Sequence, residues 1–175
     1  MLVLGIDPGI ACTGFGLLEE CAQKYCMLDY GCIVTDKNQN PEERLKELYQ
    51  EIFTLIQKSQ PNYVAVEKLF FSKNTRTAML VSQARGVILL AAAETKVKVA
   101  EYTPLEVKMS LTGWGRADKR QIQEMVRILL KLKKIPRPDD AADALAIAIC
   151  HLNSYRMKAL EVRDDLSFIG KNNQR

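Results

Sequence analysis

Residues 1–9 read MLVLGIDPG, an apolar run that ends abruptly at an acid, a proline and a glycine. The near-continuous aliphatic side chains of residues 2–6 are typical of a buried β-strand. The Pro-Gly pair stops the strand, which leaves Asp7 at its end. A buried first strand that closes on a carboxylate is therefore the starting point for both the fold and the candidate site.

Further short strands follow this one along the chain. Gly14–Leu18 and Tyr25–Val34 are expected to be strands joined by a turn, which makes the first three strands an antiparallel meander. A β-branched run over Tyr63–Val66 predicts a fourth strand, and alternation over Val97–Tyr102 predicts a fifth.

The segments between and after the later strands have apolar residues at helical spacing. Helices are expected over Pro41–Ser59, Asn74–Thr95, Pro104–Leu111, Asp118–Lys133 and Asp139–Tyr155. The second of these is apolar nearly all round at residues 87–93, so we expect the sheet or another subunit to bury it. Strands followed by alternating helix and strand predict an α/β fold with a mixed five-stranded sheet flanked by helices.

The chain has 175 residues, which suits one domain. We expect a domain over residues 1–156 and a frayed tail over residues 157–175, where the apolar period is lost. No apolar stretch is long enough for a transmembrane span. The first residues lack the basic flank of a signal peptide, so a cytoplasmic location is expected.

Five cysteines are present: Cys12, Cys21, Cys26, Cys32 and Cys150. Their odd number, the lack of a CxxC pair and the single histidine, His151, favour neither a disulfide framework nor a zinc site. The thiols are expected to be reduced and mostly buried as small apolar groups.

The net charge of +4 is unevenly distributed. Residues 1–67 carry 5 basic and 10 acidic side chains, residues 68–98 carry 6 and 1, and residues 103–137 carry 9 and 3. Such a distribution fits a basic cleft that holds a polyanion. Charge alone favours the simpler interpretation, a set of solvated helix faces.

Four carboxylates occupy unusual positions: Asp7, Glu67, Asp140 and Asp143. The first two follow apolar strands, and they would emerge at the same sheet edge if those strands are parallel neighbours. The other two are three residues apart on one helix face. Taken singly, three have a simpler interpretation: a turn residue for Asp7, a solvated rim charge for Glu67, and a first-turn acid for Asp140. Asp143 is harder to explain in this way, because it lies within an Ala/Leu/Ile run.

Four like charges in one place repel, and a hard divalent cation such as Mg²⁺ relieves the repulsion. Two such ions about 4 Å apart support phosphodiester cleavage by activating a water and stabilising the leaving oxygen. Residues 7–16 lack the spacing of a nucleotide-binding loop. His151 has no marked serine or cysteine beside it, which argues against nucleophilic catalysis.

Several motifs occur in a fixed order: Gly5–Gly9, Thr13–Gly16, Val66–Glu67 with Phe70 and Lys73–Asn74, Ser82–Gly86, Gly115–Lys119 and Asp140–Ala146. In this order and spacing they resemble the RuvC family of bacterial Holliday junction resolvases. The resemblance runs from residue 1 to about residue 152. The tail beyond residue 157 follows no family pattern, and Trp114 stands where a smaller or different residue is expected.

The resemblance implies a ribonuclease H-like fold, a homodimer and a crossover junction endodeoxyribonuclease. Such an enzyme nicks two strands symmetrically at a four-way DNA junction in recombination and repair, leaving 5′-phosphate and 3′-hydroxyl ends. It implies that Asp7, Glu67, Asp140 and Asp143 are catalytic metal ligands for two Mg²⁺ ions per site, which Mn²⁺ can replace. A branch-migration complex of the RuvA and RuvB type is implied as a partner.

The resemblance also gives the basic segments a role in DNA binding. The residues it places near DNA are Phe70, Phe71, Lys73, Asn74, Arg76, Lys108, Arg116, Lys119 and Arg120. Aromatic rings can stack on unpaired bases, and cations can contact phosphates. One ring of the Phe pair could equally belong to the core.

Three other functions remain open at this point. The chain could be another ribonuclease H-like nuclease that cuts RNA–DNA hybrids or flaps. It could be a DNA-binding module without catalysis, although all four acids are present. A relative of sugar kinases or actin also begins with a strand and an Asp-Gly turn, but it would need a second domain and a nucleotide loop.

Overall fold

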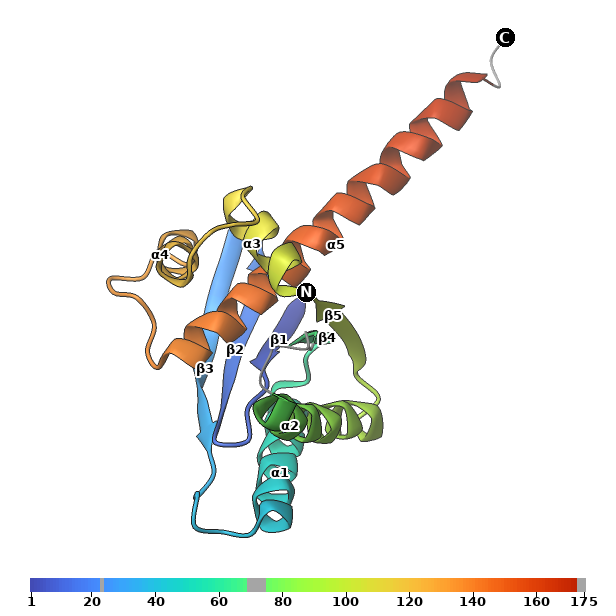
Figure 1. Ribbon diagram of the computed structural model, residues 1–175. Coiled ribbons are helices and arrows are strands. Elements are labelled where there is room, and N and C mark those ends of the chain that lie inside the picture. Colours follow the sequence, from blue (N-terminus) through green and yellow to red (C-terminus); the bar gives the residue numbers. More distant parts are fainter. Residues whose placement is uncertain (23, 69–74, 173–175) are drawn as a thin grey trace.

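A computed structural model describes the backbone of residues 1–22, 24–68 and 75–172 and the side chains of residues 1–22, 24–68 and 78–157. Its centre is one five-stranded sheet with helices on both faces (Figure 1). The predicted class, an α/β fold with a mixed five-stranded sheet, is confirmed.

The strands are β1 (Leu2–Asp7), β2 (Cys12–Cys21), β3 (Lys24–Val34), β4 (Tyr63–Glu67) and β5 (Lys98–Tyr102). They lie in the order β3-β2-β1-β4-β5. β1, β2 and β3 form the expected antiparallel meander, whereas β4 pairs parallel to both β1 and β5. The carboxyl ends of β1 and β4 therefore meet at one edge of the sheet.

The described helices are α1 (Pro41–Ser59), α2 (Thr75–Glu94), α3 (Pro104–Thr112), α4 (Lys119–Leu129) and α5 (Asp139–Asn172). Helices α1 and α2 cover one face of the sheet, and α3, α4 and α5 cover the other (Figure 1). α4 ends before the predicted limit at Lys133, because the backbone at Lys131 turns into the left-handed region with φ of 55°.

Strand alternation builds two separate cores. Val3 and Ala65 pack with α5 on one face, whereas Leu4 and Val64, the next residues along, pack with α1 and α2 on the other. The residues on both faces are almost fully buried. Each strand position is thereby assigned to one face, which decides which side chains meet α5.

α5 begins at the predicted Asp139 but is longer than predicted. Its backbone is helical to Asn172, whereas the sequence analysis ended the helix near Tyr155 and expected an irregular tail from residue 157. The polar sequence that weakens the apolar period does not break a helix, because it contains no proline. The distal part of α5 extends away from the sheet (Figure 1). The division of the chain into a domain and a tail at residue 156 stays a prediction.

Within the described residues, none of the helices combines the length and apolar character that a membrane crossing requires.

Candidate active site

Asp7 and Glu67 are the last residues of two neighbouring parallel strands. β1 and β4 pair in register up to the residue before each acid, which brings both carboxylates to the same sheet edge. Both lie on the face covered by α5, because Val3 and Ala65, at even spacing from them, pack in the α5 core. The expected adjacency of the two strand ends is confirmed.

Glycines in the sheet allow α5 to approach β1 and β2 closely. A Cβ atom on Gly14 would lie 2.0 Å from the backbone oxygen of Asp140, and one on Gly5 would lie 2.2 Å from that of Ala144. A side chain at either position would push the helix away from the sheet. Because these side chains are missing, the first turns of α5, with Asp140 and Asp143, lie over the end of β1 and the start of β2.

Burial and mutual repulsion change the acidity of these carboxyls. Burial, followed by the charges of Glu67, Asp143 and Asp140, raises the pKa of Asp7 from 3.8 to about 8. The pKa of Glu67 is raised by burial and then by Asp143. Burial also raises the pKa of Asp143, although a hydrogen bond from Lys119 partly offsets this. The carboxylates thus act on one another as one cluster, and a bound cation would relieve their repulsion.

Lys119 is a cation at this cluster. Its Nζ lies 2.9 Å from Oδ2 of Asp143 and 3.7 Å from Oδ2 of Asp139. The hydrogen bond to Asp143 raises the pKa of Lys119. Asp118 caps α4 by accepting a 2.8 Å hydrogen bond from the backbone N–H of Gln121, which fixes Lys119 in the first turn of the helix. The pairing of Lys119 with Asp143 depends on how α4 packs beside α5, so sequence spacing could not predict it.

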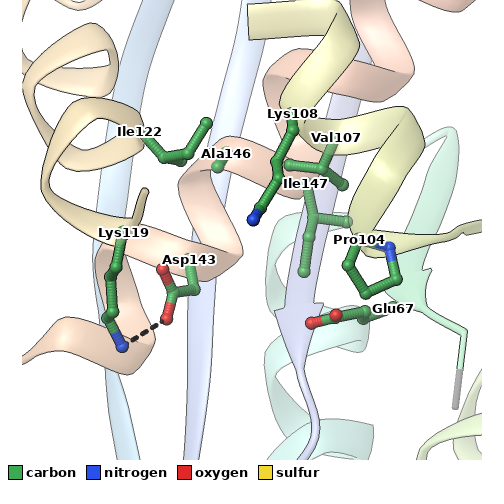
Figure 2. Close-up of a pocket in the computed structure, with 9 residues that line it drawn as sticks. All are labelled: Glu67, Pro104, Val107, Lys108, Lys119, Ile122, Asp143, Ala146 and Ile147. Atoms are coloured by element: carbon green, nitrogen blue, oxygen red, sulfur yellow. Dashed lines mark ion pairs between the residues drawn. The ribbon is translucent and has the colours of Figure 1, made fainter. Parts of the chain in front are cut away.

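A cavity of about 200 Å³ opens beside the cluster (Figure 2). Glu67 and Asp143 face it from β4 and α5, and Lys108 of α3 reaches in between them. Its remaining walls are Lys119 and apolar side chains, contributed by Pro104, Val107, Ile122, Ala146 and Ile147. The cavity combines two carboxylates, two lysine side chains and an apolar wall. This combination suits a cation together with a phosphate group.

Among the described residues, no three of the four acids bring carboxylate oxygens within 4.8 Å of one another. The cluster is therefore not a closed cage for a single ion. Mg²⁺ in phosphate-handling sites is held by one or two carboxylates together with waters and substrate oxygens. An open arrangement of four carboxylates fits that mode of binding.

A different group does meet the 4.8 Å criterion: Cys12, Cys32 and Asp140. The odd number of cysteines, the lack of a CxxC pair and the single histidine favoured neither a disulfide framework nor a zinc site. The two thiols are far apart along the chain and are brought together by the pairing of β2 with β3. Cys32 lies within the predicted strand Tyr25–Val34, but Cys12 precedes the predicted strand Gly14–Leu18, so the sequence pattern did not indicate this group.

The basic residues predicted to contact DNA are placed in two ways. Lys108 and Lys119 line the cavity, whereas Arg116 and Arg120 are exposed around the start of α4. Trp114 is also exposed, at 54%, and it borders a second cavity together with Arg120. The predicted contacts Phe70, Phe71, Lys73 and Asn74 lie outside the described residues, as does the side chain of Arg76.

Comparison with known proteins shows similarity to one family. The family model described as crossover junction endodeoxyribonuclease RuvC matches residues 3–151. The RuvC protein of Desulfitobacterium hafniense is 56% identical over 157 residues, which cover 90% of this chain and 95% of the relative. That of Halothermothrix orenii is 52% identical with the same coverage.

Solved structures give the same result. The structure of Thermus thermophilus RuvC in complex with a Holliday junction substrate superposes with a TM-score of 0.82 and 35% identity, covering 90% of this chain and 96% of that one. A yeast mitochondrial Holliday junction resolvase, Ydc2, at 16% identity and a TM-score of 0.65, shares the fold.

The fold is ribonuclease H-like, with acids gathered at the carboxyl ends of its neighbouring parallel strands. More specifically, the chain belongs to the RuvC family of crossover junction endodeoxyribonucleases.

Proposed function

We propose that this chain is a Mg²⁺-dependent endonuclease that resolves four-way DNA junctions by paired symmetric nicks, in homologous recombination and DNA repair. The observation that carries the proposal is the convergence of Asp7, Glu67, Asp140 and Asp143 at one sheet edge. There, burial and then the charges of the other three acids raise the pKa of Asp7 to about 8. Such a cluster is electrostatically costly, and divalent cations offset the cost.

The four carboxylates would hold two Mg²⁺ ions, or Mn²⁺ in their place. When bound, these ions supply an activated water and charge stabilisation for the departing 3′ oxygen, which gives 5′-phosphate and 3′-hydroxyl ends. Glu67 and Asp143 face the cavity and orient this chemistry toward a phosphate held there. The apolar residues in the cavity wall lower the local dielectric beside the carboxylates, which strengthens electrostatic interactions there.

Lys119 and Lys108 are suited to bind the phosphate group. Lys119 lies in the first turn of α4, where a cation is unfavourable against the helix dipole and an anion is favourable. Its carboxylate partners therefore stabilise it at that position. Once Asp143 is occupied by a cation, Lys119 is released to contact DNA, and Arg116 and Arg120 extend the basic surface around it. Phe70, Phe71, Lys73, Asn74 and Arg76 complete the proposed DNA contacts.

The proposed enzyme acts as a homodimer in the cytoplasm. α2 exposes apolar side chains, with Met79 at 67% and Leu90 at 51% exposure, which supports burial of this helix by a second copy. A two-fold dimer would present two sites to a two-fold symmetric junction. A branch-migration complex of the RuvA and RuvB type is the proposed partner that delivers the junction.

Cleavage of a labelled four-way junction, alongside a matched duplex and an RNA–DNA hybrid, tests the proposal. Paired symmetric nicks in the junction alone, present with Mg²⁺ and abolished by EDTA, are the expected result. Cutting of the hybrid in preference to the junction would show that the same acids serve a different nuclease activity, and it would contradict the junction specificity. Tight junction binding without cleavage under any divalent ion would contradict the catalytic proposal.

A further inference from the structure

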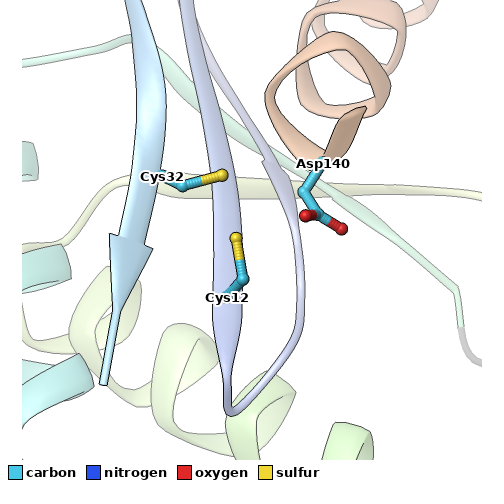
Figure 3. Close-up of side chains that lie close together, drawn as sticks. All are labelled: Cys12, Cys32 and Asp140. Atoms are coloured by element: carbon cyan, nitrogen blue, oxygen red, sulfur yellow. The ribbon is translucent and has the colours of Figure 1, made fainter. Parts of the chain in front are cut away.

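Cys12 of β2, Cys32 of β3 and Asp140 of α5 form a compact group beside the candidate active site (Figure 3). One sulfur from each cysteine and one carboxylate oxygen all lie within 4.8 Å of one another. The three side chains are partly buried. They come from three different elements, so the fold rather than local sequence creates the group.

The sheet register explains why the two thiols meet. Gly14 pairs with Cys32, and Cys12 lies two residues from Gly14 on the same strand face. A Cβ on Gly14 would lie 2.0 Å from the backbone oxygen of Asp140, so this is the face against which the start of α5 packs. Both sulfurs therefore lie on the side of the sheet from which Asp140 approaches.

The spacing suits a shared metal ion better than a disulfide. Cys12 pairs with Val34, which makes Cys32 its diagonal neighbour across the two strands. Diagonal neighbours have Cα atoms about 7–8 Å apart, whereas a disulfide requires less than about 7 Å. Two thiolates on a tetrahedral zinc ion lie about 3.8 Å apart, given Zn–S bonds of about 2.3 Å. That separation falls within the 4.8 Å over which the donor atoms are gathered.

We propose that Cys12, Cys32 and Asp140 bind a thiophilic divalent cation such as Zn²⁺, at a second site that shares Asp140 with the magnesium site. On binding, each thiol releases its proton to water as its sulfur bonds to the ion. Three protein ligands leave a fourth position for water, as in open zinc sites. The consequence for cleavage rests on the proposed function: an ion held by the thiolates draws Asp140 away from Mg²⁺ and inhibits the nuclease.

A matched control lies at the other end of the same strand pair. Cys21 and Cys26 are also within hydrogen-bonding reach of each other across β2 and β3. Cys21 Sγ lies 3.8 Å from Glu19 Oε2, but among the described residues no third donor there completes a group within 4.8 Å. A Cys21→Ser/Cys26→Ser double variant therefore removes two thiols of similar setting without touching the proposed site.

The binding test uses the reduced full-length protein and Cd²⁺ alone as the probe. Thiolate-to-cadmium charge-transfer absorption should saturate at one ion per chain in the wild type and in the Cys21→Ser/Cys26→Ser control. In separate Cys12→Ser, Cys32→Ser and Asp140→Asn variants, affinity should fall by at least about tenfold, since even an outer-shell partner costs that much. Circular dichroism identifies any variant that fails to fold, and the remaining variants then decide the result. Unchanged binding in folded Cys12→Ser and Cys32→Ser, or loss in the control, would overturn the site.

The coupling test compares Mg²⁺-dependent junction cleavage with and without Zn²⁺ within each variant. Zn²⁺ should slow the wild type and the Cys21→Ser/Cys26→Ser control, and the Zn²⁺ concentration for half inhibition should rise by at least about tenfold in Cys12→Ser. Cadmium binding without zinc inhibition would overturn the sharing of Asp140. A chain that cuts no junction even with Mg²⁺ would contradict the proposed function, whereas the cadmium result would still decide the thiolate site.

Discussion

The two faces of the sheet differ in how closely a helix backbone approaches the strands. On one face, α1 and α2 bury large aliphatic residues such as Ile52 and Ile88 against Ile6 of the sheet. On the other face, α5 also buries large aliphatic residues such as Leu145, but at Gly5 and Gly14 its backbone packs directly against the strands. We infer that the first face mainly supplies stability, whereas the second also uses its close helix approach to hold charged groups in fixed positions.

The candidate site follows from this difference. Asp7 and Glu67 lie on the α5 face because of strand parity, and Asp140 and Asp143 reach them because no side chain at Gly14 keeps the helix away. Substitutions on the α5 face should therefore change activity, and substitutions on the α1–α2 face should change stability alone.

The largest effect is expected for Asp7→Asn on the α5 face. Loss of a carboxylate at the centre of the cluster should lower the junction cleavage rate by roughly 10³-fold or more, about 4 kcal/mol in activation free energy. Junction binding, measured by gel shift, should remain, because basic residues supply it. Glu51→Gln, an exposed acid on α1, is the matched control and should cut at the wild-type rate. Wild-type cleavage by Asp7→Asn would contradict the site.

On the opposite face, Ile52→Ala should change stability instead. Ile52 is fully buried, so its truncation should lower the free energy of unfolding by about 2–5 kcal/mol in chemical denaturation. The remaining folded protein should cleave junctions at the wild-type rate, measured below the unfolding transition. A large loss of activity in fully folded Ile52→Ala would show that the two faces are not separable.

The glycine contacts can be tested with two matched substitutions. Gly14→Ala places a Cβ 2.0 Å from the backbone oxygen of Asp140, whereas Gly86→Ala in α2 meets nothing within 4 Å. The first should destabilise the protein by about 1–3 kcal/mol and lower the cleavage rate by displacing α5. The second should be neutral or stabilising by about 0.5–1 kcal/mol, because alanine favours a helix. Thermal unfolding and junction cleavage are measured for both variants. Equal stability and equal cleavage rates in the two variants would contradict the role of Gly14 in the close approach of α5.

The pKa of Asp7 predicts a smaller, pH-dependent effect in the metal-free protein. Because its pKa is raised from 3.8 to about 8, the folded state binds the proton more tightly than the unfolded chain does. The free energy of unfolding therefore falls as the pH rises through that range. Asp7→Asn lacks this titration, so near pH 9 it should be more stable than the wild type by about 1–3 kcal/mol, and near pH 4 the gap should close.

Mg²⁺ provides the control for this pH effect. It should raise the melting temperature of the wild type at high pH and should have little effect on Asp7→Asn, as followed by calorimetry. A wild-type protein that gains stability between about pH 5 and 8 relative to Asp7→Asn would have the opposite sign and would contradict the buried cluster.

Much of this arrangement could be predicted from the sequence because the signals are local. The apolar run before Asp7 and the β-branched run before Glu67 each predicted a strand that ends in an acid, and Asp143 was conspicuous within an alanine-rich helix. The mixed sheet followed from the order of the elements. The adjacency of the two acids depended on β1 and β4 being parallel neighbours, a condition that the structure meets. The family resemblance named the same acids.

The remainder depends on contacts between distant segments. The Lys119–Asp143 ion pair arises from the packing of α4 beside α5, and the meeting of Cys12 with Cys32 requires the register of β2 and β3. Neither is encoded in the spacing of neighbouring residues. The extension of α5 to Asn172 was missed because loss of apolar period was taken as loss of helix.

The central claim is that a divalent cation is held where β1, β4 and the start of α5 meet. Fe²⁺ can replace Mg²⁺ as a probe, because with ascorbate and peroxide it breaks the polypeptide next to its binding site, and mass spectrometry locates the breaks. The account predicts breaks near Asp7, Glu67 and Asp140–Asp143 that excess Mg²⁺ suppresses. Breaks confined to other parts of the chain, or breaks near these acids that Mg²⁺ leaves unchanged, would contradict it.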